Sequence, residues 1–113
     1  MKRNKYHNKK VVYNGIKFDS IKERNYYMIL KNYEKNGRIR DLKTQVPFEL
    51  IPTYKINGKT IRKTQYYADF TYVSTKDNQL HIVDTKGVKT QVYKVKKKLF
   101  EYKYQMEIEE IWY

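Results

Sequence analysis

Three charged residues stand where two β-rich runs of the sequence would otherwise bury apolar side chains. Asp69 interrupts an aromatic run, whereas Asp84 and Lys86 end the apolar run that begins at Leu80. Side chains alternate between the two faces of a strand, so Asp84 and Lys86 share a face. Mg²⁺ prefers oxygen ligands and can stabilise the charge that develops when a phosphodiester is cleaved. The pattern therefore predicts metal-dependent cleavage of a nucleic acid.

The strand register decides whether Asp69 joins the other two residues, and the packing of the first helix over that end decides whether Glu23 does. Asp69 joins Asp84 only if the two strands pair in a register that places both carboxylates on one face. Lys86 would then stand beside the metal, where it could orient or help to deprotonate a water and offset phosphate charge. Glu23, near the start of a predicted helix, could add a third carboxylate.

Each of these residues also has a simpler interpretation. Glu23 could serve only as a helix cap. Asp69 could be a half-exposed strand residue paired with a lysine. Asp84 and Lys86 could form a surface ion pair, which is common and contributes about 0–1 kcal/mol.

The composition favours a polyanionic partner. Among 113 residues, 25 are Lys or Arg and 12 are Asp or Glu, which gives a formal net charge of +13. This excess favours DNA over an anionic membrane, and the apolar runs are too short to cross a bilayer. The absence of cysteine excludes a disulfide framework and a thiolate metal site. We therefore expect one domain over residues 1–113 in a cytoplasmic protein.

The first part of the chain predicts an arm, a hairpin and a helix. Residues 1–10 are basic and predict an arm that is solvated or lies on phosphates. Asn14-Gly15 between apolar runs predicts a hairpin with a type I′ turn. Ser20 and Glu23 match a capping box for a helix over residues 21–36. Helical spacing places Glu23 at the edge of the face that packs inward.

The middle of the chain predicts strands. Residues 42–54 predict a strand, in which Pro47 implies an edge position or a bulge. Residues 55–64 predict an exposed hairpin loop, whose basic residues are Lys59, Arg62 and Lys63. Residues 65–73 and 80–86 then predict the central hairpin, which Gly87 would end.

The last part predicts a helix over residues 90–104 and a strand over residues 107–113. Helical spacing assigns the apolar side of the helix to Val92, Val95, Leu99 and Tyr102. The opposite side is rich in lysine, with Lys94, Lys97, Lys98 and Lys103. The complete order predicts an α/β domain with a central mixed sheet flanked by helices, preceded by an N-terminal β-hairpin.

Five short blocks of the sequence resemble a known superfamily. An acid in a helix, Asp in one strand and Asp-x-Lys at the end of the next resemble the PD-(D/E)XK nucleases. The blocks as a set are similar to a phage-encoded family of small proteins of unassigned function within that superfamily, whose core is shared with Holliday-junction resolvases and restriction endonucleases. The blocks are Phe18-Asp19-Ser20-x-x-Glu23, Gly37-x-Ile39, Gln45-x-Pro47-Phe48-x-Leu50, Tyr67-x-Asp69-Phe70 and Val83-Asp84-x-Lys86-Gly87.

The resemblance implies a restriction-endonuclease-like core in the order αβββαβ and a role for each matched residue. It implies that Asp69 is the shared metal ligand and that Asp84 is the second acidic ligand, assisted by the backbone carbonyl of Thr85. It implies that Lys86 is the catalytic lysine and that Glu23 is the acid contributed by the helix. The metal would be Mg²⁺ or Mn²⁺.

The resemblance also implies residues around this set. Gln45 would lie near the site. A Gln-x-x-x-Tyr motif of some superfamily nucleases is absent from the second helix, and Lys94, Lys97 and Lys98 would take over its phosphate contacts. We expect Lys59, Arg62 and Lys63 to bind DNA as well.

The residues thus predict a metal-dependent DNA endonuclease, and the resemblance implies that it is phage-associated and acts in the host cytoplasm. A structure-specific or junction-resolving activity would need two symmetric cuts and so predicts a homodimer. Two other functions stay open on the same fold: a non-catalytic DNA-binding module, and a phage factor that binds a host protein.

Overall fold

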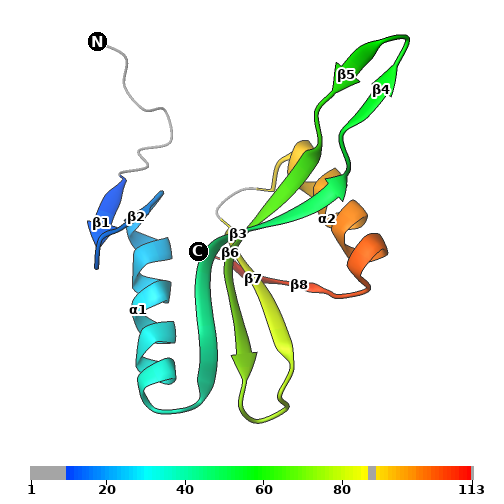
Figure 1. The fold of residues 1–113 in the computed structure, drawn as a ribbon. Helices are drawn as coiled ribbons and strands as arrows, with labels where there is room; N and C mark the ends of the chain where they lie inside the picture. The colour runs from blue at the N-terminus through cyan, green and yellow to red at the C-terminus, as the bar shows by residue number, and fades with distance from the viewer. Residues whose placement is uncertain (1–9, 87–88, 113) are drawn as a thin grey trace, which may run out of the picture.

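The computed structural model describes residues 10–86 and 89–112, which form an α/β domain with a mixed central sheet and two helices (Figure 1). Most of the predicted basic arm and Gly87 lie outside these ranges. The elements in chain order are β1 (Val11–Tyr13), β2 (Ile16–Phe18), α1 (Ile21–Lys35), β3 (Ile39–Ile51), β4 (Tyr54–Ile56), β5 (Lys59–Ile61), β6 (Thr64–Ser74), β7 (Leu80–Lys86), α2 (Gln91–Tyr104) and β8 (Ile108–Trp112).

The central sheet has four strands in the order β3-β6-β7-β8. The first two pairings are antiparallel, whereas β8 lies parallel to β7 after the crossover through α2. Pro47 lies in β3, which is an edge strand, as its missing N–H predicts. β3 ends at Ile51, earlier than predicted, immediately before Pro52, which also lacks an N–H.

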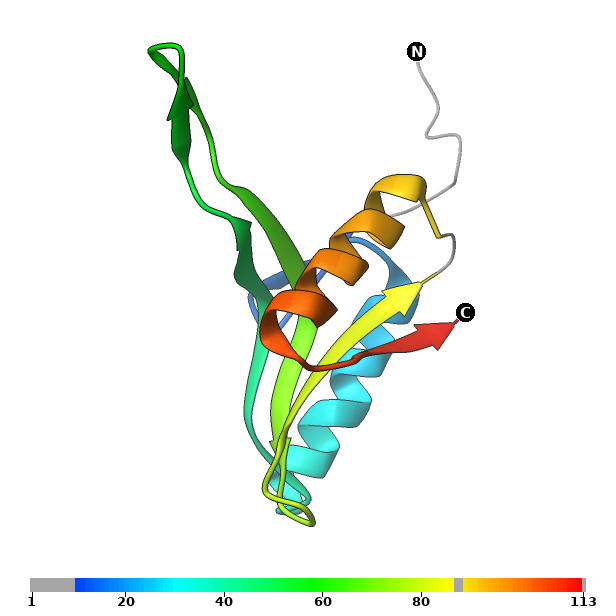
Figure 2. The ribbon, with the colours of Figure 1, turned by 90° about the vertical axis from the view of Figure 1, so that its right-hand side faces the viewer.

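The two helices cover opposite faces of the sheet (Figure 2). Neighbouring residues of β7 show this division, because Ile82 belongs to the hydrophobic core under α2 and Val83 to the core under α1. Both side chains are fully buried. β7 is therefore an internal strand with apolar packing on both faces, and only its end carries charge.

The beginning of α1 agrees with the predicted capping box, with one difference. The Ser20 side chain accepts a hydrogen bond from the Glu23 backbone N–H at 3.0 Å, as an N-cap should. The Glu23 carboxylate, however, accepts from the Asp19 N–H rather than from Ser20. Glu23, Tyr27 and Leu30 are the buried residues of the helix, so the predicted spacing is confirmed and Glu23 lies inside rather than at the edge.

The predicted apolar side of α2 is confirmed only for Leu99, which packs against the core, and is wrong for Val92, Val95 and Tyr102, which are exposed. Val92 and Tyr102 are 65% and 82% exposed, whereas Tyr93 and Phe100 are buried. Phe100 packs against the rings of Phe48 and Tyr66 on the sheet. Both sets of residues have helical spacing, and the larger aromatic rings take the buried side because they remove more apolar surface from water.

This correction can be tested by comparing two substitutions in α2. Phe100→Ala is expected to lower the free energy of unfolding by about 3–5 kcal/mol, because it leaves a cavity under the helix. Tyr102→Ala is expected to change the free energy of unfolding by about 0.5 kcal/mol or less, because the exposed Tyr102 ring is not packed in the core. Urea denaturation followed by circular dichroism measures both. Similar losses for the two variants would contradict the assigned face.

β4 and β5 form a two-stranded arm that projects from the sheet between β3 and β6 (Figures 1 and 2). The predicted turn at the N-terminal hairpin is confirmed, since Asn14 and Gly15 have φ values of 54° and 74°. In the described part of the chain, neither helix is long and apolar enough to span a membrane.

Candidate functional site

The candidate site lies where β6 and β7 diverge. The last paired residues of this ladder are Phe70 and Val83, and the same register continued sets Asp69 opposite Asp84. Beyond Val83 the backbone N–H of Thr85 donates to Asp69 Oδ2 at 2.8 Å, and the Thr85 hydroxyl donates to the same oxygen at 2.8 Å. The Asp69 carboxylate therefore accepts hydrogen bonds from Thr85 of β7 at the point where strand pairing stops.

Asp84 is buried and Lys86, its ion-pair partner, is partly buried, so the interpretation as an exposed surface ion pair is wrong. Lys86 Nζ lies 3.0 Å from Asp84 Oδ1, and the two side chains are 16% and 5% exposed. The Tyr66 hydroxyl donates to the other oxygen, Oδ2, at 2.5 Å. The ammonium group also lies 3.6 Å from the centre of the Tyr93 ring, a cation–π geometry that fixes its position.

Gln45 connects Glu23 to Asp69. Its side-chain amide donates to Glu23 Oε1 and to Asp69 Oδ1, both at 3.2 Å. Gln45 has a φ of 50°, a left-handed conformation that costs energy for a residue other than glycine or asparagine. The structure therefore brings Glu23, Asp69, Asp84, Lys86 and Gln45 together, with Glu23 joined to the others through the amide.

Burial makes it costly to ionise the carboxyl groups of this cluster. Desolvation raises the pKa of Asp84 to about 7, and the neighbouring Asp69 carboxylate adds to the rise, against the opposing bonds from Tyr66 and Lys86. Desolvation likewise raises the pKa of Glu23 to about 7, again with a contribution from Asp69. The Lys86 ammonium pairs with one of these carboxylates, Asp84, and the pKa of Asp84 is raised despite this partner. A bound cation would lower the cost of ionising them.

The donor set fits Mg²⁺ through two carboxylates rather than three. Among the described residues, no three His, Cys, Asp or Glu side chains lie together at metal-binding spacing. Asp69 and Asp84, however, stand opposite each other when the β6–β7 register is continued by one residue, and Asp69 contributes to the raised pKa of Asp84. Mg²⁺ commonly takes one or two carboxylates and completes its shell with waters. The structure thus fits a pair of acidic ligands, and Glu23 is linked to one of them, Asp69, through the side-chain amide of Gln45.

The sequence did not reveal two residues of the site. Tyr66 reaches Asp84 only because of the strand register, which no local pattern specifies. Tyr93 had a signal, since Tyr93, Phe100 and Tyr104 have i, i+7, i+11 spacing on α2. Its ring holds Lys86, and its hydroxyl donates to Glu110 at 2.7 Å.

The basic residues expected to bind DNA divide into two groups. Lys94 and Lys98 are exposed on α2, whereas Lys97 is engaged with Glu110 at 3.3 Å and is less accessible. Lys59, Arg62 and Lys63 are exposed on or next to the arm, as predicted.

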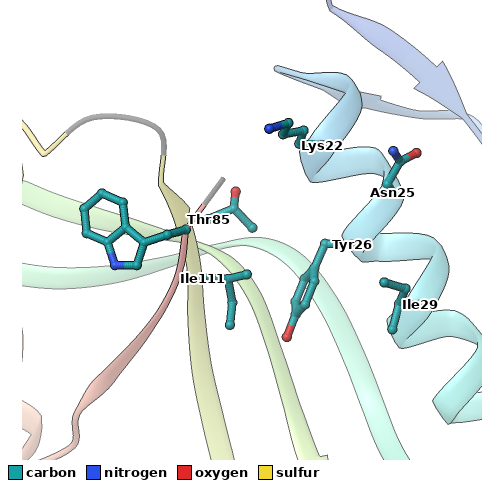
Figure 3. A pocket seen from close by; sticks show the side chains of 7 residues that line it. Lys22, Asn25, Tyr26, Ile29, Thr85 and Ile111 are labelled. Atoms are coloured by element: carbon teal, nitrogen blue, oxygen red, sulfur yellow. The ribbon is translucent and has the colours of Figure 1, made fainter.

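A shallow hollow of about 170 Å³ lies beside the site between α1 and β8 (Figure 3). Thr85, which holds Asp69, forms part of its wall. Its apolar lining residues include Tyr26 and Ile29 from α1 and Ile111 and Trp112 from β8.

Comparison with known proteins identifies a family but no characterised relative. No curated protein and no solved structure matches the chain. One family model, described as "Protein of unknown function (DUF1064)", matches residues 3–113, nearly the whole sequence. The chain therefore belongs to the DUF1064 family.

Proposed function

We propose that this protein is a Mg²⁺-dependent DNA endonuclease of the PD-(D/E)XK type on a restriction-endonuclease-like fold. The observation that carries the proposal is the buried cluster at the end of β7, in which Asp84 and Lys86 pair at 3.0 Å and Asp69 lies beside them. A structural ion pair would need neither the second carboxylate nor the raised pKa values of Asp84 and Glu23.

The arrangement of the elements supports the proposal. With the β1–β2 hairpin and the β4–β5 arm set aside, the order is α1, β3, β6, β7, α2, β8, which is the αβββαβ order of the superfamily core. The acids come from the helix and strands that the superfamily uses: Glu23 from α1, Asp69 from β6 and Asp84 from β7.

The residues that would hold the metal are Asp69 and Asp84, with the Thr85 backbone carbonyl as an expected third oxygen. A bound Mg²⁺ would supply Lewis-acid stabilisation of the phosphate oxygens and a more acidic water. Glu23, through Gln45, would keep the Asp69 carboxylate oriented.

Lys86 would act on the substrate itself. Its ammonium lies at the edge of the cluster, held by Asp84 and by the Tyr93 ring, so it can donate a hydrogen bond to a phosphate oxygen or position the attacking water. Lys94 and Lys98 on α2, and the basic residues of the arm, would hold the flanking phosphates.

The proposal is tested by incubating the purified protein with Mg²⁺ or Mn²⁺ and a panel of duplex, single-stranded and four-way-junction DNA. We expect cleavage of at least one substrate, lost in EDTA. Binding without cleavage of any of them would indicate a non-catalytic DNA-binding module. Neither binding nor cleavage, with recovery of a stoichiometric protein partner, would indicate a protein-binding factor.

Tyr66→Phe provides a finer test of the site. The variant removes a hydrogen bond that lowers the pKa of Asp84, so the pKa should rise and ionisation should require higher pH. We expect cleavage at pH 7 to fall about 10-fold and to recover at higher pH. Tyr104→Phe is the control, because that hydroxyl donates to the Glu49 backbone away from the site. An unchanged pH profile for Tyr66→Phe would contradict the role of the hydroxyl.

A further inference from the structure

The arm of β4 and β5 has no packing partner within the described chain. Residues 52–60 are all exposed, and neither strand contributes a buried residue. The turn residues Asn57 and Gly58 have φ values of 50° and 75°, so the ribbon has the type I′ turn that fixes its register. An isolated two-stranded ribbon gains little stability alone. Its presence is thus better explained by an external partner than by folding.

The two faces of the arm differ in character. Tyr54 pairs with Ile61 and Ile56 with Lys59, whereas Lys55 pairs with Thr60 on the opposite face. Three apolar side chains therefore share one face, and Tyr54 and Ile56 remain 47% and 57% exposed. Ile56 directly precedes the turn, so an apolar side chain stands at the tip of the arm.

The charge of the arm identifies the class of partner. The sequence between Glu49 and Asp69 contains no acidic residue and four basic ones, Lys55, Lys59, Arg62 and Lys63. In the described ranges none of the four forms an ion pair. A second copy of this chain, with its own net charge of +13, would repel such a surface. A nucleic acid offers phosphates for the basic residues and bases for the apolar face.

The arm is placed to act together with the candidate site. β6 starts where the arm ends, and β7 runs antiparallel to β6, so β7 finishes at the end of the sheet from which the arm projects. Asp84 and Lys86 lie at that end. DNA held along the arm would therefore approach the cluster.

We propose that the arm inserts its tip, Ile56 with Tyr54 behind it, between bases of DNA at a branch or mismatch next to the cleaved phosphate. Proteins that insert apolar side chains between base steps must unstack them, and the cost is lowest where stacking is already interrupted. Branched or mismatched DNA is thus the preferred substrate class. This inference rests on the proposed nuclease function for the position of the cut, but the binding step stands on the arm alone.

The test measures binding by the full-length Asp84→Asn protein in EDTA, so that cleavage does not interfere. The DNA is a four-way junction with 2-aminopurine at the branch point, compared with a matched linear duplex. We expect at least 10-fold tighter binding to the junction and a rise in 2-aminopurine fluorescence as the base is unstacked.

Three added substitutions separate the contributions. Ile56→Ser should abolish the fluorescence rise and reduce the junction preference to about 2-fold or less, with duplex affinity retained. Lys59→Gln should weaken binding to both DNAs alike and lower the salt-dependence slope by about 1. Val92→Ser, at an exposed apolar position of α2, is the matched control and should change neither.

Two results with the arm variants would overturn the inference, and a third is given below. One is an Ile56→Ser protein that unstacks the junction as its parent does. The other is an arm variant whose mass in sedimentation changes while its DNA binding does not. That result would show that the arm mediates contact between copies of the chain. Cleavage by the wild-type protein with arm-independent binding would refute this inference alone. Arm-dependent binding without cleavage by wild type would refute only the nuclease function.

Discussion

Asp84→Asn is expected to reduce the rate of Mg²⁺-dependent DNA cleavage by about 10³-fold or more, equivalent to about 4 kcal/mol of transition-state stabilisation. The carboxylate is the most deeply enclosed acid of the cluster, with Tyr66 on one oxygen and Lys86 on the other. The amide has nearly the same shape but lacks the negative charge that a cation and the Lys86 ammonium require. Initial rates on labelled DNA measure the effect.

The control for this substitution is Glu49→Gln. It makes the same change of charge at a position that faces Lys103, with 3.9 Å between Lys103 Nζ and Glu49 Oε2, on the exposed part of β3. Its cleavage rate should stay within about 2-fold of wild type. Thermal unfolding shows whether each variant is folded. Full activity in a folded Asp84→Asn protein would refute the catalytic site, whatever else the protein binds.

In the presence of a chelator, the free energy of unfolding is expected to fall as the pH rises from 5 to 8. The folded protein holds a proton on Glu23 and on Asp84 up to a pKa of about 7, whereas the unfolded chain releases these protons near its ordinary values of 4.5 and 3.8. The folded state therefore binds more protons in this range, and raising the pH favours unfolding. At about 1.4 kcal/mol for each pKa unit, each carboxyl contributes about 2–3 kcal/mol of the loss.

His81 contributes to the same slope. Burial lowers its pKa, but hydrogen bonds and charge from Glu109 and Asp77 outweigh burial and raise it above 6.5. A raised histidine pKa gives stability that is present at low pH and is lost as the pH rises through the folded pKa. The histidine and the two acids thus act in the same direction.

Glu23→Gln isolates the contribution of one acid. Urea denaturation at several pH values in EDTA should show a clearly smaller pH dependence for this variant and a higher stability than wild type at pH 8. Glu34→Gln on the same helix lies outside the cluster and should leave the slope unchanged. A wild-type stability that rises between pH 5 and 8 would contradict the buried, proton-holding state of these carboxyls.

Much of the fold was predictable because it depends on local geometry. Asn14-Gly15 and Asn57-Gly58 supply the positive φ values that their turns need, and Ser20 caps the helix that follows it. The edge position of Pro47 follows from its missing N–H. The face of α2 was not predictable from spacing alone, since two sets of apolar residues share the helical period and only the packing against Phe48 and Tyr66 selects one.

The sequence by itself determined that Asp84 and Lys86 share a face, because strand side chains alternate whatever the partner strand. Only the tertiary structure decided that Asp69 and Glu23 join them. The β6–β7 register and its divergence after Val83 bring Asp69 to the Thr85 N–H, and the positive φ of Gln45 lets its amide connect Asp69 to Glu23 across α1 and β3. These contacts join segments 16 to 24 residues apart, so they depend on long-range packing that no short stretch of sequence encodes.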